Sequence, residues 1–194
     1  MNFTDMVAEV QGLVKRPDKA AAIGSAINSA LSQYVFRTEF TQDLVETTIP
    51  IDAEEYSQTL DLTALDPALI RFRKWKYIKP YGVRGYLLPI DPQNVFVPGG
   101  SIQTDRYYMI GSRLTILVSA LASSLSVGYF QHAPVLSGSN TFWLTDLCPY
   151  AVINRAAGEI FNAIGDPKSG AFYLALAEQL YTTLANDCRD QYTY

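Results

Sequence analysis

The chain has 194 residues, of which 48% are hydrophobic and 12% aromatic, and it carries a formal net charge of −4. This hydrophobic fraction can build an ordinary core and excludes a wholly disordered chain. The acidic start lacks the basic region of a secretory signal, and the most apolar stretch, residues 114–127, is too short and too rich in serine to cross a bilayer. We therefore expect a soluble, intracellular globular protein without membrane contact.

The residues that usually carry catalysis are sparse. Two cysteines and one histidine provide almost no material for a metal cluster or a disulfide scaffold. His132 is expected to be an exposed residue at a strand end, and the glycines at 82–85 and 98–100 lack the Lys-Ser/Thr ending of a phosphate cradle. We predict no catalytic, cofactor-binding or metal-binding residue, no cofactor and no enzymatic activity.

Two helices are predicted at the start of the chain. Apolar residues recur at helical spacing over residues 3–13, and a second stripe runs over residues 23–34. Pro17 ends the first pattern, and Asp18 is expected to cap the second helix. Neither helix is basic enough to read DNA as a helix-turn-helix.

Strands are predicted from residue 43 onward. In the segment 70–77 the apolar residues change parity after Arg73, which predicts a β-bulge because one extra residue turns every later side chain to the opposite face. The last three strands are predicted to form a meander. The expected strands cover residues 44–49, 56–62, 70–77, 107–110, 114–118 and 125–130.

The chain ends in two further helices, over residues 145–164 and 169–187. Thr145 is expected to be an N-cap, Pro149 falls in the first turn, and Tyr150 begins an apolar stripe. The order of elements predicts an α+β fold, in which the N- and C-terminal helices form one bundle and an antiparallel, barrel-like β block is inserted between them. The expected parts are a helical hairpin at 1–42, the β block at 43–140, the helices at 141–188 and a tail at 189–194.

Charge is unevenly distributed along the chain. Residues 67–90 contain six basic residues and no acidic one, between two acidic flanks. Such a block indicates either an electrostatic contact with a partner or a solvated strand face. The candidate contact residues are Arg71, Arg73, Lys74, Lys76, Lys79 and Arg84, together with Arg189, Tyr192 and Tyr194 of the tail.

An ordered series of motifs resembles the head–tail adaptor (connector) proteins of tailed bacteriophages. After the N-terminal helix pair, residues 65–73 (LDPALIRFR) are similar to the family's entry into a strand, and residues 87–96 (LLPIDPQNVF) to its turn-and-helix segment. Residues 106–116 (RYYMIGSRLTI) are similar to its hairpin. Residues 129–150 resemble its "Tyr-Tyr-x-x-Pro-x-x-Leu-Ser" and "Trp-Leu" motifs, although Cys-Pro-Tyr at 148–150 and the long loop at 91–106 depart from the pattern.

This resemblance implies a structural protein of the virion, located at the head–tail interface after assembly in the host cytoplasm. Such adaptors form a closed ring, usually twelvefold, whose partners are the portal protein, a tail nozzle or tail-tube protein, and further copies of the same chain. Genomic DNA would pass through the channel without specific binding during ejection, since a net-acidic wall repels phosphates. In related adaptors the chain end reaches the portal, which implies the same role for the tail at 189–194.

Other functions remain open on the sequence alone. The protein could be another tail or baseplate component, or a nucleic-acid-binding protein that uses residues 71–84, where aromatic residues alternate with basic ones. A carbohydrate-binding module that uses Trp75 or Trp143 is a further alternative.

Overall fold

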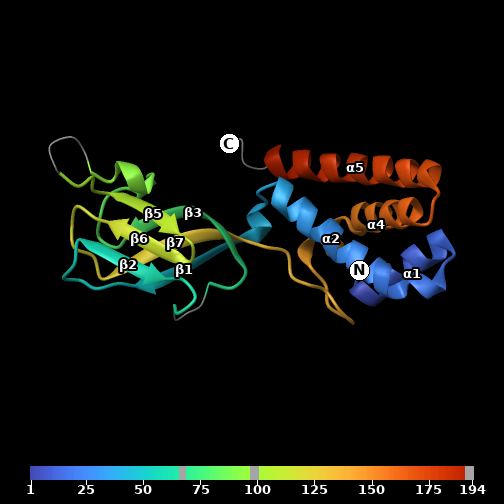
Figure 1. Ribbon diagram of the computed structural model, residues 1–194, viewed down its shortest axis with the longest axis horizontal. Helices are drawn as coiled ribbons and strands as arrows, with labels where there is room; N and C mark the ends of the chain where they lie inside the picture. The colour runs from blue at the N-terminus through green and yellow to red at the C-terminus, as the bar shows by residue number, and fades with distance from the viewer. Residues whose placement is uncertain (66–68, 97–100, 191–194) are drawn as a thin grey trace. The chain divides into compact units, whose positions relative to one another are not determined.

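The chain divides into two compact units, each with its own hydrophobic core (Figure 1). The structure is a computed structural model that describes residues 1–65, 69–96 and 101–190, apart from the side chains of residues 189–190. The helical unit comprises Met1–Asp43 and His132–Tyr194, and the β unit comprises Leu44–Gln131. This arrangement is the α+β fold that the sequence predicted.

Up to residue 190, where the described chain ends, the helical unit is built from four long helices and one short one. Asn2 caps the first helix by accepting a hydrogen bond from the Asp5 N–H at 2.9 Å, and Lys15 ends it in the left-handed conformation at φ 55°. The helices are α1 (Phe3–Val14), α2 (Ala20–Arg37), α3 (Trp143–Leu147), α4 (Pro149–Ala163) and α5 (Pro167–Asp190).

The predicted cap of α2 is wrong. A 3₁₀ turn at Pro17–Lys19 leads into the helix, and no side chain caps its first turn. Asp18 instead accepts two hydrogen bonds from the Arg16 guanidinium, both at 2.8 Å. The fixed φ of Pro17 starts the turn, so the aspartate is free to pair with its neighbour.

The predicted stripe of α2 forms the centre of the helical core. Ile23, Ile27, Leu31 and Tyr34 are fully buried. The Tyr34 ring stacks on Tyr181 of α5 with ring centroids 4.3 Å apart. Residues of α1 and α4 complete this cluster, so the N- and C-terminal helices share one core, as expected.

The start of α4 differs from the expectation. Pro149 is its first residue, as predicted, but Thr145 lies inside the short helix α3, where its hydroxyl accepts a hydrogen bond from the Phe142 N–H at 3.0 Å. Tyr150 is 51% exposed and therefore does not belong to the buried stripe. Because α3 ends at Leu147 and α4 begins at Pro149, the two helices are separate. A single helical period across residues 145–164 could therefore not predict which side chains are buried.

Over its described residues, 44–65, 69–96 and 101–131, the β unit contains two sheets, and neither closes into a barrel, which corrects the barrel-like expectation. One sheet has the order β1-β7-β3 and is antiparallel, and the other has the order β2-β6-β5-β4 with one short parallel pair between β4 and β5. The strands are β1 (Leu44–Pro50), β2 (Ser57–Asp61), β3 (Phe72–Pro80), β4 (Leu88–Pro89), β5 (Arg106–Ile110), β6 (Arg113–Leu117) and β7 (Ser124–Gln131).

The predicted three-stranded meander is also wrong. β5 and β6 form a hairpin, but β7 leaves their sheet and becomes the central strand of the other one. Alternate side chains of β7, including Leu125 and Val127, join the core of the β unit. The bulge after Arg73 is confirmed, because the pairing of β3 with β7 shifts register between Phe72 and Lys74.

Candidate partner-binding surfaces

Most of the basic residues of segment 71–84 lie on or beside one edge strand. Arg71 directly precedes β3, in the left-handed conformation at φ 52°, and its guanidinium donates to Gln131 Oε1 at 2.7 Å. Lys74, Lys76 and Lys79 are exposed on β3, Arg73 is half-buried, and Arg84 is exposed beyond the strand. The structure therefore gathers five of the six basic contact candidates of segment 71–84 at a single strand.

Three of these cations surround one aromatic ring. Phe130 of β7 is only 2% exposed. Its ring centroid lies 5.4 Å from Arg73 Cζ, 5.8 Å from Lys74 Nζ and 5.7 Å from Lys76 Nζ. The negative face of an aromatic ring attracts cations at this distance. Packing on Phe130 therefore positions all three cationic side chains around one ring.

A polar bridge crosses the same sheet. Tyr77 of β3 donates a hydrogen bond to Glu46 Oε1 of β1 at 2.6 Å, and this bond raises the pKa of the phenol. Beside it, Tyr86 packs against Tyr77 with ring centroids 5.5 Å apart, and Lys79 Nζ lies 6.0 Å from the Tyr86 ring. This face of the sheet thus combines aromatic rings with both acidic and basic side chains.

Both tryptophans take part in internal packing. Trp75 is half-buried and its Nε1–H points to Met109 Sδ at 3.1 Å, beside a hollow of about 380 Å³ between β3 and β5. Trp143 donates from Nε1 to Asp43 Oδ1 at 2.7 Å and packs edge-on against Phe40. Each indole N–H is therefore engaged by another side chain of the protein.

The sequence matches the family of SU10 adaptor proteins over residues 1–193, which is nearly the whole chain. The chain belongs to this family. SU10 adaptors are phage head–tail adaptor proteins, so the role is a structural one in the virion, and the resemblance read from the sequence motifs is confirmed. A comparison with curated proteins found no match.

The C-terminal contact candidates of this adaptor are only partly placed. Arg189 falls in the last turn of α5. Tyr192 and Tyr194 lie outside the described residues.

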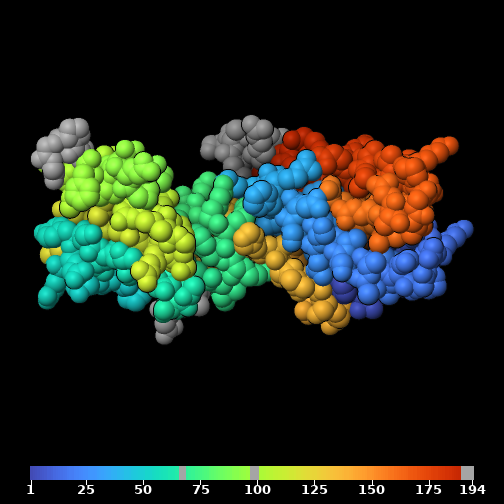
Figure 2. All heavy atoms as spheres, in the orientation of Figure 1, coloured from blue at the N-terminus to red at the C-terminus, as the bar shows by residue number. Residues whose placement is uncertain are grey.

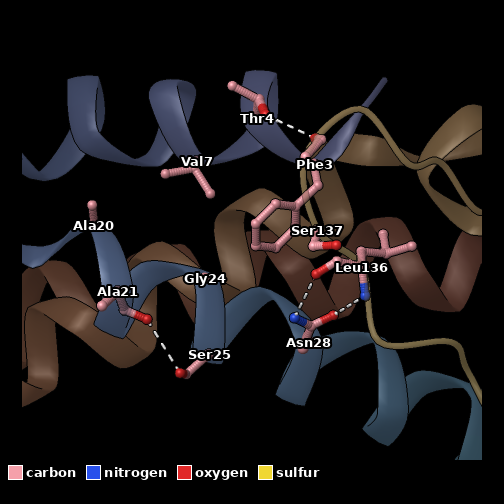
Figure 3. A pocket seen from close by; sticks show the side chains of 11 residues that line it. Phe3, Thr4, Val7, Ala20, Ala21, Gly24, Ser25, Asn28, Leu136 and Ser137 are labelled. Carbon is pink, nitrogen blue, oxygen red and sulfur yellow. Dashed lines mark hydrogen bonds between the residues drawn. The ribbon is translucent and has the colours of Figure 1, made fainter.

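The adaptor has a second hollow, in the helical unit, that sequence reasoning missed. It measures about 450 Å³ and lies between α1, α2 and the segment at residues 136–138 (Figure 3). The Asn28 side chain holds that segment by bonding both the N–H and the C=O of Leu136, at 2.8 and 3.1 Å. The available signal was the run of alanine, glycine and serine at the start of α2, which leaves little side-chain volume there.

The described part of the adaptor contains no cluster of three or more residues suited to holding a metal ion. Across residues 1–65, 69–96 and 101–190, no helix combines the length and apolarity needed to span a bilayer. His132 is exposed just after β7, as predicted, and Cys148 and Cys188 are both free thiols.

Proposed function

We propose that this adaptor assembles as a ring, twelvefold as the resemblance implies, between the portal and the tail nozzle or tail tube. The observation that carries the proposal is the family match over residues 1–193. The protein acts as a structural connector without catalytic turnover. Assembly takes place in the host cytoplasm, and the finished ring remains at the head–tail interface of the virion.

The basic strand supplies one contact of this ring. Lys76, Lys79 and Arg84 are exposed side chains that an acidic surface of the portal or of a neighbouring subunit would meet. The helical unit has an excess of acidic residues, whereas the β unit has equal numbers of both signs. Opposite charges steer two surfaces together and set their register, which supports a contact that involves β3.

The tail at 189–194 supplies a second contact, with the portal. Tyrosine combines a large apolar ring with a polar end, so Tyr192 and Tyr194 suit a groove on a partner protein. Ordering six residues costs roughly 6–12 kcal/mol of backbone entropy, which these rings and their hydrogen bonds must offset.

DNA passes through the ring without specific binding. The net charge of −4 gives a mild repulsion toward phosphates, and repulsion keeps the genome from adhering to the channel during ejection. A protein that gripped DNA through β3 would instead lose affinity steeply as salt concentration rises.

The deciding experiment mixes the purified adaptor with the portal protein of its own phage and images the product by electron microscopy. We expect a monomer in light scattering when the adaptor is alone, and a ring of adaptor subunits on the portal after mixing. Absence of portal binding would reject the adaptor role, and salt-sensitive DNA binding in its place would favour the nucleic-acid alternative.

A further inference from the structure

The two sheets of the β unit present four edge strands, and three of them end in a proline. These three strands are β1, β3 and β4, which end at Pro50, Pro80 and Pro89. In addition, β3 has two register shifts and four basic residues, and β4 is only two residues long. Prolines, bulges, lysines and short length all keep an edge strand from pairing with another chain. The fourth edge strand, β2, has none of these features.

The outer edge of β2 is regular and longer than the strand itself. The strand pairs with β6 in a continuous antiparallel register. At one end Val118 N–H donates to the Tyr56 carbonyl at 2.9 Å. At the other end Leu62 N–H donates to the Ser112 carbonyl, also at 2.9 Å. The ladder, and with it the outer edge, therefore covers residues 56–62.

Alternate backbone groups of this edge point away from the sheet. Both terminal bonds to β6 involve even-numbered residues, so the odd-numbered residues direct their N–H and C=O groups outward. The outward residues, Ser57, Thr59 and Asp61, are all exposed. Within the part of the chain that the structure describes, the one outward group with a partner is the Asp61 carbonyl, which accepts from Ala64 N–H at 3.1 Å. Three N–H groups and two carbonyl groups are therefore available to an added strand.

An acidic turn precedes this edge. Asp52, Glu54 and Glu55 are exposed there. The buried side chain of Gln58 holds the turn, since its Oε1 accepts from Asp52 N–H at 2.8 Å and its Nε2 donates to the Glu55 carbonyl at 3.2 Å. The sequence contains no basic residue over positions 38–70. A fixed group of carboxylates therefore stands at the start of β2.

The distribution of charge along this edge favours a basic partner over a second copy. At the far end Arg113 of β6 is the register partner of Asp61, and opposite charges in such a pair attract each other. The uncompensated charge is therefore concentrated at the acidic turn. If two β2 strands paired with each other about Thr59, the acidic turn of each copy would approach Asp61 of the other, and like charges oppose such a pairing.

We propose that an extended, basic segment of the tail protein next to the adaptor adds to β2 as a new outer strand, a contact that rests on the adaptor role proposed above. Strand addition derives its affinity from main-chain hydrogen bonds and its specificity from alternate side chains. The exposed basic residues of β3 suit an acidic partner surface, so the acidic edge suits a second partner of opposite charge. An adaptor with the portal on one side meets the tail on the other. Figure 2 shows the teal segment that contains β2 at the surface of the β unit.

The two faces of β2 define the sequence of the incoming strand. Leu60 and Leu62 pack against the core of the β unit, whereas Ser57, Thr59 and Asp61 are exposed on the other face. An added strand continues the same alternation. Its apolar side chains would extend the core beside the two leucines, and its polar side chains would face solvent. A lysine or arginine at the end that lies beside the acidic turn would complete the match.

The symmetry of the ring compensates for the small size of each contact. A stable complex of two proteins usually buries about 800 Å² per partner, more than one added strand covers. A single subunit is therefore expected to bind the tail protein weakly. A ring presents the same edge once in every subunit, so a tail protein of matching symmetry engages many edges at once and gains affinity through avidity.

Hydrogen exchange tests this edge residue by residue. In the adaptor alone, NMR should show fast exchange at the outward amides of Ser57, Thr59 and Asp61, and slow exchange at the amides of Leu60 and Leu62, which face β6. Adding the purified tail protein of the same phage to the adaptor–portal complex should slow the exchange of this edge, measured by mass spectrometry. Slow exchange of the outward amides in the adaptor alone would overturn the proposal, because the edge would already be covered.

Two variants separate the backbone from the charge. Thr59→Pro removes an outward N–H without removing a bond to β6, and should weaken binding of the tail protein at least about tenfold. Its control is Thr59→Val, which also loses the hydroxyl but keeps the N–H and should bind like the parent protein. Glu54→Lys/Glu55→Lys leaves the strand intact and should weaken binding by a similar factor through charge repulsion. Its control, Asp5→Lys/Glu9→Lys, makes the same charge change at exposed positions of α1.

Portal binding is measured alongside with the same proteins. A ring on the portal whose β2 edge gains no protection from the tail protein keeps the proposed function and rejects this contact. Undiminished tail binding by both Thr59→Pro and Glu54→Lys/Glu55→Lys would also reject it. Protection of the edge in concentrated adaptor alone would identify a second copy as the occupant and overturn the tail partner. Protection by the tail protein without portal binding would keep this contact and reject the ring on the portal.

Discussion

The ring of Tyr77 lies directly against Gly128, in the middle of the three-stranded sheet. A Cβ atom on this glycine would come within 2.5 Å of Tyr77 Cε1. From this position the phenol reaches over β7 to Glu46 on β1. The absence of a side chain at one central position therefore allows a single tyrosine to connect both edge strands of the sheet.

Gly128→Ala should destabilise the protein by about 1–3 kcal/mol, because the methyl group has no space beside the Tyr77 ring. Chemical denaturation measures the change. In a protein that already carries Tyr77→Ala, Gly128→Ala should change the free energy of unfolding very little, since the obstructing ring is gone. Gly12→Ala is the matched control: its Cβ meets open space within α1, so it should stabilise by roughly 0.5–1 kcal/mol.

Gly158→Ala should likewise destabilise, by about 1–3 kcal/mol, through the contact between α4 and α5. A Cβ atom at this position would lie 2.7 Å from Leu174 Cγ and 3.0 Å from the carbonyl oxygen of Gly170. The backbone oxygen cannot rotate away as a flexible side chain can. Differential scanning calorimetry should show a lower Tm, and a Tm equal to that of the parent protein would mean that the two helices are further apart.

Tyr34→Phe should weaken the dependence of stability on alkaline pH. Burial raises the pKa of Tyr34 to about 12, well above the ordinary value of a tyrosine. The folded state therefore retains the proton more tightly than the unfolded chain, so the stabilisation is complete below pH 10 and is lost as the pH rises toward 12. The loss amounts to at most about 3 kcal/mol. Denaturation curves at pH 8 and pH 11 should differ less for Tyr34→Phe than for the parent protein.

Lys79→Glu/Arg84→Glu should impair portal binding without unfolding the protein. Both side chains are exposed, so reversing their charge changes an approaching surface far more than it changes folding. We expect weaker binding in a sedimentation assay and an unchanged Tm. The matched control, Lys15→Glu/Arg113→Glu, applies the same charge change at two other exposed positions.

Reversing the charge of Arg71, Arg73 and Lys74 would be a less suitable test, because Arg73 and Lys74 pack on Phe130. Normal portal binding by Lys79→Glu/Arg84→Glu would show that this end of the basic strand only faces solvent.

Deletion of residues 189–194 should reduce portal binding while the helical core stays intact. The described core contacts of α5 lie before this segment, and the stacked pair of Tyr34 and Tyr181 is retained. Surface plasmon resonance on immobilised portal measures the loss. Tyr192→Ala/Tyr194→Ala should reproduce most of it, whereas Thr193→Ala should not. Full binding by the deleted protein would show that the tail has no part in docking.

Local sequence rules predicted where the helices and strands lie better than they predicted which strands pair with each other. The change of parity after Arg73 revealed the bulge, because side-chain alternation is a local property of one strand. The pairing of β7 was missed, because alternation does not identify the neighbouring strand. A clue was present at residues 127–130, an unbroken run without charge or strong polarity, which is typical of a central strand covered on both faces.

For the candidate surfaces, too, the sequence predicted local features but not contacts between distant residues. Clustered charge identified the basic strand, since charge is visible in a linear sequence. The cations around Phe130 could not be anticipated, because the ring comes from a strand more than fifty residues away.

The pairing of Leu44 with Phe130 brings together the two points at which the chain enters and leaves the β unit. These residues stand at the entrance and the exit of the β unit, and they face each other across neighbouring antiparallel strands. Cα atoms in such pairs are only about 4.5–5.5 Å apart. A tight turn is therefore enough to close the gap that removal of the whole unit would leave. Since the core of the helical unit contains no residue of the β unit, such a removal leaves all residues of that core in place.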